Sequence, residues 1–430
     1  MFCRKKLSIN FDVLFSRQTT VSVKKWLSYS AIEAKSLERM MAVNPVDTEL
    51  LLNTQMQKRE RKRRSSERNT INLFRHVQTY KSHSFKEKKF VFEPEVARDI
   101  CQNILQHSQA DSNAPLIETD GGLYLIARQF REVSPRPIIV CERDKAFTPL
   151  HSKLLDFDNV SVVDLHYIKL HQKMMDDEEI HDCAFADLTS KFRNGWSNPK
   201  PAYTLFSTIP HAFIKYLCTR LLCAWDGELR HLRGNEYFDM RPEYFVMVPP
   251  KTILYYIHSH PYSRSQPFYH LFHLMFDFQV IGKYPVHAYM PWSRTKETVS
   301  KRPWTKQFHE DQDKLILMKL RPKVDIGLEK PEEFKAHDLM FLLSCVRRST
   351  RFSPSGNFIS MMEKFSPGVG YDLIKKAGMT CARKATEVKS SEIIPVLNIV
   401  RAQKDYHLSH FVTSAKMHAL SMPDVFKGLV

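Results

Sequence analysis

Residues 116–147 constrain the fold more than any other stretch of the chain. They begin with an apolar run, pass through an acid and a pair of glycines (ETDGG), continue as a helical run and end in a second apolar run, IIVCE. Two buried strands joined through a tight turn and a helix form a βαβ unit with parallel strands. The sequence therefore predicts an α/β fold and places a ligand site at the carboxyl ends of its strands.

Three residues of this unit suit a nucleotide-like ligand. Gly121 and Gly122 allow a tight turn between strand and helix, where the amide groups of the helix face whatever is bound. Glu142 follows the second strand, where a carboxylate accepts hydrogen bonds from two neighbouring ribose hydroxyls. Glu142 is equally consistent with an ordinary solvated acid at a strand end, and the spacing alone leaves both interpretations open.

Hydrophobic periodicity predicts the elements that follow. Helices are expected at residues 94–106, 213–225, 250–258 and 268–278, and strands at residues 160–165, 202–206, 244–248, 286–290 and 315–320. The last two strands are expected to form an antiparallel addition at one edge of the sheet. Beyond residue 322 the pattern predicts only short helices, at residues 334–346, 358–365, 369–377, 393–400 and 411–420.

Five short motifs carry a resemblance to a known family. They are ETDGGLYL (118–125), CERDKAF (141–147), VVDLHYIKL (162–170), STIP (207–210) and MPWSR (290–294). In this order and at these intervals they resemble the ribosomal RNA adenine dimethyltransferases, most closely the mitochondrial transcription factor B branch. The resemblance spans about residues 85–378. It implies an S-adenosylmethionine-dependent methyltransferase fold, a Rossmann-like sheet with helices on both faces, plus a small all-α C-terminal domain.

The resemblance also implies a set of residues that contact S-adenosylmethionine. The matching positions in this chain are Val91, Glu118, Gly122, Glu142 and His166. The family has an adenine-reading acid where this chain has His166, which still offers one hydrogen bond to an adenine edge. Asp120 and Tyr124 stand at glycine positions of the family, so the backbone is expected to approach the cofactor less closely.

A second set of residues matches the motif that holds the target adenine in the family. It consists of Thr208, Pro210 and His211, where the family has an Asn-Leu-Pro-Tyr type motif. A threonine side chain is too short to replace the carboxamide that accepts from the adenine amine. Histidine can stack on a base, but less strongly than tyrosine does. The base-holding pair is therefore degenerate. The scattered cysteines and histidines show no metal-ligand spacing, and the cysteines are expected to be free thiols.

The net charge of +17 is concentrated near the N-terminus, where residues 1–92 contain 20 Lys and Arg against 8 acids. A dense basic run suits contacts to phosphate groups, or else serves only as a solvated linker. It comprises Lys58, Arg59, Arg61, Lys62, Arg63 and Arg64. Arg347 and Arg348 close a predicted helix, where they either line a nucleic-acid cleft or simply complement the helix dipole.

The chain divides into four predicted segments. Residues 1–29 are basic with the single acid Asp12, which is typical of a mitochondrial transit peptide, although a disordered basic tail has the same composition. A basic extension (30–84), a methyltransferase-like domain (85–322) and a helical domain (323–430) are expected to follow. No run of eighteen apolar residues occurs, so a membrane span is not expected.

Two functions are consistent with these features. The favoured one is a transcription initiation factor of the mitochondrial matrix and nucleoid, which assists a mitochondrial RNA polymerase by holding single-stranded promoter DNA. The alternative is an active S-adenosylmethionine-dependent adenine N6,N6-dimethyltransferase of the mitochondrial small-subunit rRNA. Departures at the glycine turn, at His166 and at Thr208 and His211 all fall in one pocket, and they favour the factor because each lost contact lowers a transfer rate.

Overall fold

A computed structural model gives the fold of the chain. It describes residues 89–142, 147, 159–164, 198, 200–209, 211–226, 241–257, 266–290, 313–352 and 357–420. The predicted transit peptide, the basic run at residues 58–64, His166 and Pro210 lie outside these residues.

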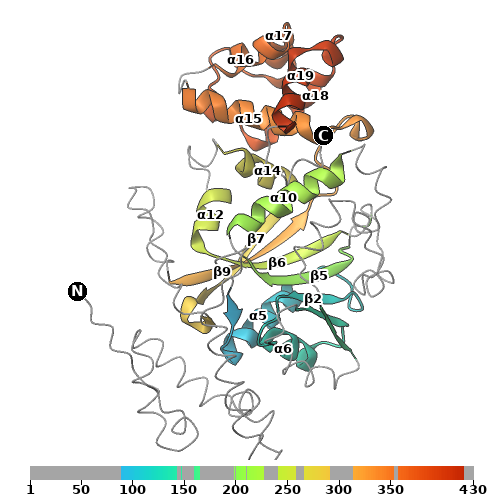
Figure 1. Cartoon of the computed structure of the whole chain (residues 1–430), viewed down its shortest axis with the longest axis vertical. Coiled ribbons are helices and arrows are strands. Elements are labelled where there is room, and N and C mark those ends of the chain that lie inside the picture. The colour runs from blue at the N-terminus through green and yellow to red at the C-terminus, as the bar shows by residue number, and fades with distance from the viewer. Residues whose placement is uncertain are drawn as a thin grey trace, which may run out of the picture.

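A seven-stranded sheet forms the centre of the molecule (Figure 1). In spatial order its strands are β4 (Val160–Val163), β3 (Ile138–Cys141), β2 (Leu116–Thr119), β5 (Tyr203–Thr208), β6 (Pro242–Val248), β9 (Lys314–Pro322) and β7 (Phe276–Pro285). The first five strands are parallel, and β9 is antiparallel to both of its neighbours. An antiparallel addition is present at one edge, made of β9 and β7 rather than of β9 and the strand expected at residues 286–290. The predicted α/β fold with a mostly parallel sheet is confirmed.

Helices cover both faces of the sheet, because alternate residues of the central strands point to opposite sides. Leu116 and Val140 join one buried cluster with α5 (Pro94–His107) and α6 (Leu125–Val133). Ile117 and Ile139 join the other cluster, which includes residues of three further helices. These are α10 (His211–Trp225), α12 (Pro250–Tyr256) and α14 (Pro267–Met275). A proline in the first turn of α5, α12 and α14 helps each to begin, since it needs no amide partner there.

Every described element after β9 is helical, as predicted. The longer helices are α15 (Ala336–Phe352), α16 (Phe358–Phe365), α17 (Val369–Ala377), α18 (Ser390–Arg401) and α19 (His410–Leu420). They lie together at one end of the molecule, beyond α10 and α14 (Figure 1). Phe341 of α15 and Leu271 of α14 belong to the same hydrophobic cluster, so these helices continue the core that covers one face of the sheet. The predicted boundaries of the four segments stay predictions.

Near residue 280 one predicted helix ends earlier than expected, and one predicted strand is wrong. The helix expected at residues 268–278 ends at Met275, and β7 begins at Phe276. The strand expected at residues 286–290 is a short 3-10 turn, Val286–Ala288, followed by the two-residue strand β8 (Tyr289–Met290). β7 is an edge strand with exposed polar residues, and the register shift between Val280 and Gly282 interrupts its alternation. A bulge of this kind interrupts the two-residue alternation of apolar and polar side chains by which a strand is predicted from sequence.

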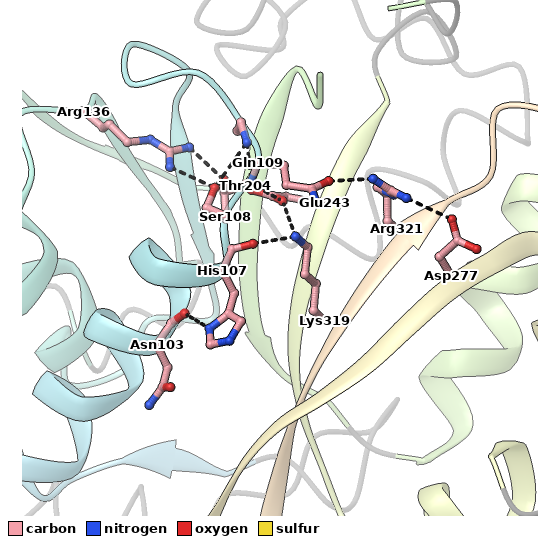
Figure 2. A network of polar contacts seen from close by, with 11 residues as sticks. Asn103, His107, Ser108, Gln109, Arg136, Thr204, Glu243, Asp277, Lys319 and Arg321 are labelled. Atoms are coloured by element: carbon pink, nitrogen blue, oxygen red, sulfur yellow. Dashed lines mark hydrogen bonds and ion pairs between the residues drawn. The ribbon is translucent and has the colours of Figure 1, made fainter. Parts of the chain in front are cut away.

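A buried polar network crosses the amino ends of the strands (Figure 2). Glu243 of β6 is fully buried, accepts from Thr204 Oγ1 at 2.8 Å and pairs with Lys319 Nζ at 3.4 Å. Ser108, just after α5, also donates to Glu243. Arg136 Nη2 donates to Thr204 Oγ1 at 2.8 Å. We call these five residues the Glu243 network; it ties β5, β6 and β9 to the end of α5 and to the segment before β3.

Candidate functional site

The glycine turn, residues 119–124, connects β2 with α6 at the carboxyl edge of the sheet. Its backbone is left-handed at Asp120 (φ 54°), Gly122 (φ 55°) and Tyr124 (φ 57°). Glycine adopts this region freely, whereas other residues do so at some cost in energy. Asp120 and Tyr124 therefore adopt positive φ angles, which glycine favours.

Two acids from neighbouring strands hold the turn in place. Glu142, directly after β3, accepts a hydrogen bond at Oε2 from the Gly122 amide at 2.9 Å, and its side chain is buried. Glu118 of β2 accepts at Oε2 from the amide of Ala127, the third residue of α6, also at 2.9 Å. The amides of Gly122, in the turn, and of Ala127, in the first turn of the helix, are thus engaged by the protein's own carboxyl groups.

The charge of Glu142 also affects the ionisation of Glu118. Burial raises the pKa of Glu118 to about 8, the hydrogen bond from Ala127 opposes this rise, and the nearby charge of Glu142 adds to it. At neutral pH the Glu118 carboxyl is therefore mostly protonated. In this structure the Glu118 side chain is buried and supports the start of α6, so its role is structural.

An aromatic ring lies over the glycine turn. A Cβ atom built on Gly122 would come within 3.0 Å of three ring atoms of Phe90, and one built on Gly121 would lie 2.8 Å from Cδ1 of Tyr124. Phe90 and Phe147 are both buried, and their ring centroids are 5.3 Å apart. The missing side chain of Gly122 is therefore filled by the protein itself, which sequence reasoning did not foresee.

Val91, also a member of the predicted cofactor set, directly follows Phe90 in the chain. It lies with Phe90 in the short strand β1 (Phe90–Val91), which pairs antiparallel with β8, so that Phe90 faces Met290 and Val91 faces Tyr289. The Val91 side chain is buried in the cluster of α5 and α6. Val91 thus anchors the segment that carries Phe90.

The predicted base-holding residues are only partly described. Thr208 is the last residue of β5 and is partly buried, opposite Met247 of β6. His211 begins α10, but the position of its side chain is not described. Nearby, Thr119 Oγ1 donates to Ser207 Oγ at 2.5 Å across the ends of β2 and β5. This pair was not predicted, although two hydroxyl residues at neighbouring strand ends were a visible signal.

Of the residues predicted to bind nucleic acid, the structure describes only the backbone positions of two. Arg347 and Arg348 lie on α15, in its second half, and their side chains are not described. The basic run at residues 58–64 falls outside the described residues. Within the described part of the chain, no three Cys, His, Asp or Glu side chains gather closely enough to hold a metal ion. None of the described helices is long and apolar enough to span a membrane.

S-adenosylmethionine does not fit against the glycine turn as the side chains stand here. The ring of Phe90 takes the space over Gly122, and the Gly122 amide already donates to Glu142. Glu142 itself is only 3% exposed, so its carboxylate cannot reach ribose hydroxyls in this arrangement. The structure brings Glu118, Gly122 and Glu142 of the predicted site close together. Their polar groups form hydrogen bonds within the protein.

Comparisons with known proteins bear on the fold. The structure is similar to that of the 23S rRNA methyltransferase ErmE, with 13% identity and a TM-score of 0.42 over 72% of this chain and 98% of that one. It is also similar to a dimethyladenosine transferase from Plasmodium falciparum, with 10% identity and a TM-score of 0.44 over 73% of this chain and 98% of that one. No protein-family model and no curated protein matches the sequence.

Proposed function

We propose that this chain is a mitochondrial transcription initiation factor, built on a methyltransferase-like fold, that assists a mitochondrial RNA polymerase by holding the single strands of a melted promoter. The observation that carries the proposal is the packing of the glycine turn: the ring of Phe90 fills the space where a Cβ of Gly122 would lie, and the Gly122 amide donates to Glu142. A turn packed in this way supports a role in which methyl transfer is weak or absent, as the degenerate motif at Thr208 also does.

The charge of the chain supports nucleic acid as the partner. The net charge is +17, and residues 58–64 and 347–348 offer clustered Lys and Arg. Such clusters bind phosphates without reading base sequence, so binding to a single strand is expected to weaken steeply as salt rises. Residues 1–29 have the composition of a mitochondrial transit peptide, which supports action in the matrix.

The test is run-off transcription by the cognate mitochondrial polymerase on duplex and premelted promoters, with and without this protein. We expect the protein to be required on the duplex and largely dispensable on the premelted template. Glu142→Ala should preserve this activity, since promoter contacts do not pass through the glycine turn. Activity on the duplex that does not change when the protein is added would overturn the proposal.

A matched pair of variants tests the nucleic-acid surface. Arg347→Ala with Arg348→Ala should impair transcription on the duplex, whereas Lys404→Ala with Lys416→Ala removes the same charge from exposed positions elsewhere on the helical part and should not. Thermal unfolding of both variants separates a lost contact from a lost fold. Equal effects of the two pairs would show that only total charge matters.

One observation favours the second function, adenine dimethylation of small-subunit rRNA. Glu118, Gly122 and Glu142, which the resemblance assigns to the cofactor site, lie close together, with Glu142 Oε2 2.9 Å from the Gly122 amide. If this function is real, Glu142→Ala will abolish a dimethyladenosine mark on mitochondrial rRNA in cells while transcription continues. Retention of all such marks in cells lacking the protein would exclude it.

A further inference from the structure

We propose that the outer face of α17 is a stacking surface for single-stranded nucleic acid, on which the ring of Tyr371 packs against a base and Lys375 contacts the adjacent phosphate. We call Tyr371, Ile374 and Lys375 the Tyr371 face. The inference rests on the proposed function in taking a single strand as the partner, and it names a place on the chain that holds this strand. It adds a contact to bases, which clusters of Lys and Arg alone do not supply.

Tyr371 differs from the other aromatic residues in its exposure. Its side chain is 67% exposed, and it is the one exposed aromatic residue among those whose side chains the structure describes. The opposite side of α17 is anchored by Val369 and Leu373, which are buried in the hydrophobic cluster of the helical part. The helix therefore does not need the tyrosine for its packing, and the ring offers a flat apolar surface to a ligand.

Lys375 places a positive charge beside this ring. Its Nζ lies 5.5 Å from the centroid of the Tyr371 ring, because residues four apart share one face of a helix. Within the part of the chain that the structure describes, Lys375 forms no ion pair, whereas Lys376 pairs with Asp372 at 3.4 Å. The charge of Lys375 is therefore available to a phosphate, and Ile374, which is 39% exposed, extends the apolar surface next to it.

The basic charge of the helical part is concentrated around α17. Residues 364–384, from the end of α16 to the loop after α17, contain five Lys and Arg and one acid. Residues 385–420 contain four Lys and Arg and three acids. The attraction for a phosphate backbone is therefore greater around α17, at the end of the helical part that points away from the sheet (Figure 1).

A single strand fits this combination better than a protein partner does. Bases of any sequence stack on an aromatic ring, and positive groups beside the ring contact the phosphates of the strand. The buried centres of protein interfaces, by contrast, are poor in lysine. The Tyr371 face has a lysine against the ring itself, and a second lysine follows it in the chain. Unpaired bases are therefore the ligand of this face.

The experiment measures binding of the full chain to two labelled strands of equal length by fluorescence anisotropy. One strand is an oligothymidylate, and the other is an abasic sugar-phosphate strand. Tyr371→Ala should weaken binding to the oligothymidylate about fivefold or more and leave binding to the abasic strand unchanged, because only the first strand has bases to stack. Tyr371→Phe keeps the ring and should bind like the wild type.

Lys375→Ala should weaken binding to both strands, because both contain phosphates. It should also lower the log–log salt slope by about 0.7, the value for one phosphate contact on a single strand. Two variants on α19 are the matched controls and should bind both strands like the wild type. Met417→Ala truncates a side chain that is 63% exposed, and Lys416→Ala removes the same charge from an exposed position. Thermal unfolding of every variant checks that its fold is kept.

The proposal is overturned if Tyr371→Ala binds the oligothymidylate like the wild type, or if it weakens binding to the abasic strand equally. Normal strand binding together with weaker binding to the polymerase would assign the face to a protein partner and would also overturn it. Run-off transcription separates this inference from the proposed function. If the wild type does not stimulate transcription while Tyr371→Ala still loses binding to bases, only the proposed function fails.

Discussion

Lys319 Nζ of β9 lies 3.4 Å from Glu243 Oε2 of the neighbouring strand β6, and both side chains are at least nine-tenths buried. The pair crosses an antiparallel boundary in a sheet that is otherwise largely parallel. Thr204 and the amide of Gln109 also donate to Glu243, so its charge is compensated from three directions. Such compensation is what makes a buried carboxylate tolerable, and its loss is costly.

Glu243→Gln is expected to destabilise the protein strongly. The change leaves the buried charge of Lys319 without its counter-charge, which costs about 3–5 kcal/mol of unfolding free energy. Urea denaturation at neutral pH measures it. Glu333→Gln is the control, because Glu333 pairs with Lys330 at an exposed position and its loss should leave the midpoint nearly unchanged. Equal midpoint shifts in the two variants would contradict a bracing role for the Glu243 network.

Glu118 is expected to make stability fall as pH rises. Its pKa is about 8 in the folded chain, against an ordinary value of 4.5. The protonated form is thus favoured by folding; its contribution is complete below about pH 4.5 and is lost as pH rises through 8. Glu118→Gln cannot ionise and can still accept from Ala127. The melting temperature of the variant relative to wild type should therefore increase from pH 5 to pH 8, and a constant difference would refute the shift.

Gly122→Ala is expected to destabilise through two separable effects. A positive φ strains any residue with a Cβ by about 1–2 kcal/mol, and overlap with the ring of Phe90 adds about 1–3 kcal/mol. Gly378→Ala is the control for strain alone, since its φ is 62° and its Cβ would meet nothing within 4 Å. In a Phe90→Ala background the overlap disappears. Additive free energies in this double-mutant cycle would show that the ring does not cover the turn.

Asn357→Ala should weaken the start of α16. The Asn357 side chain accepts from the amides of Ile359 and Ser360, at 2.9 and 3.3 Å, and therefore caps the helix. Losing such a cap costs about 1 kcal/mol, which chemical denaturation can resolve. Asn357→Asp keeps the accepting oxygen and should retain most of the stability. A loss with aspartate as large as that with alanine would show that the donation to Cys381 O is the more important contact.

Much of the fold followed from patterns within short stretches. The unit from Leu116 to Cys141 could be predicted because its apolar strands flank a glycine pair. Helices α16 and α17 lie at the residues that the hydrophobic periodicity predicts. β7 was misjudged because four of its ten residues are exposed and its bulge at Val280 and Gly282 shifts the alternation. An edge strand has one unpaired side, so fewer of its side chains need to be apolar.

The sequence predicted that some of the candidate residues would lie together, but not the contacts that they make. Glu118, Gly122 and Glu142 meet as expected, because parallel strands end at the same edge. Phe90 was missed, since the contact joins residues far apart in sequence and depends on the pairing of β1 with β8. Glu243 had a readable signal: a single acid in the otherwise apolar strand PEYFVMV needs buried partners, although the sequence does not name them.

The position of β9 has a consequence for how the chain is made. β9 is the last strand of the sheet in sequence, yet it lies between β6 and β7. While the ribosome has not yet delivered residues 314–322, β6 has an open edge and β7 has no neighbour among the described strands. Open edges invite pairing with other chains. The nascent protein therefore passes through its most aggregation-prone stage just before the helical part is synthesised, when a chaperone is needed most.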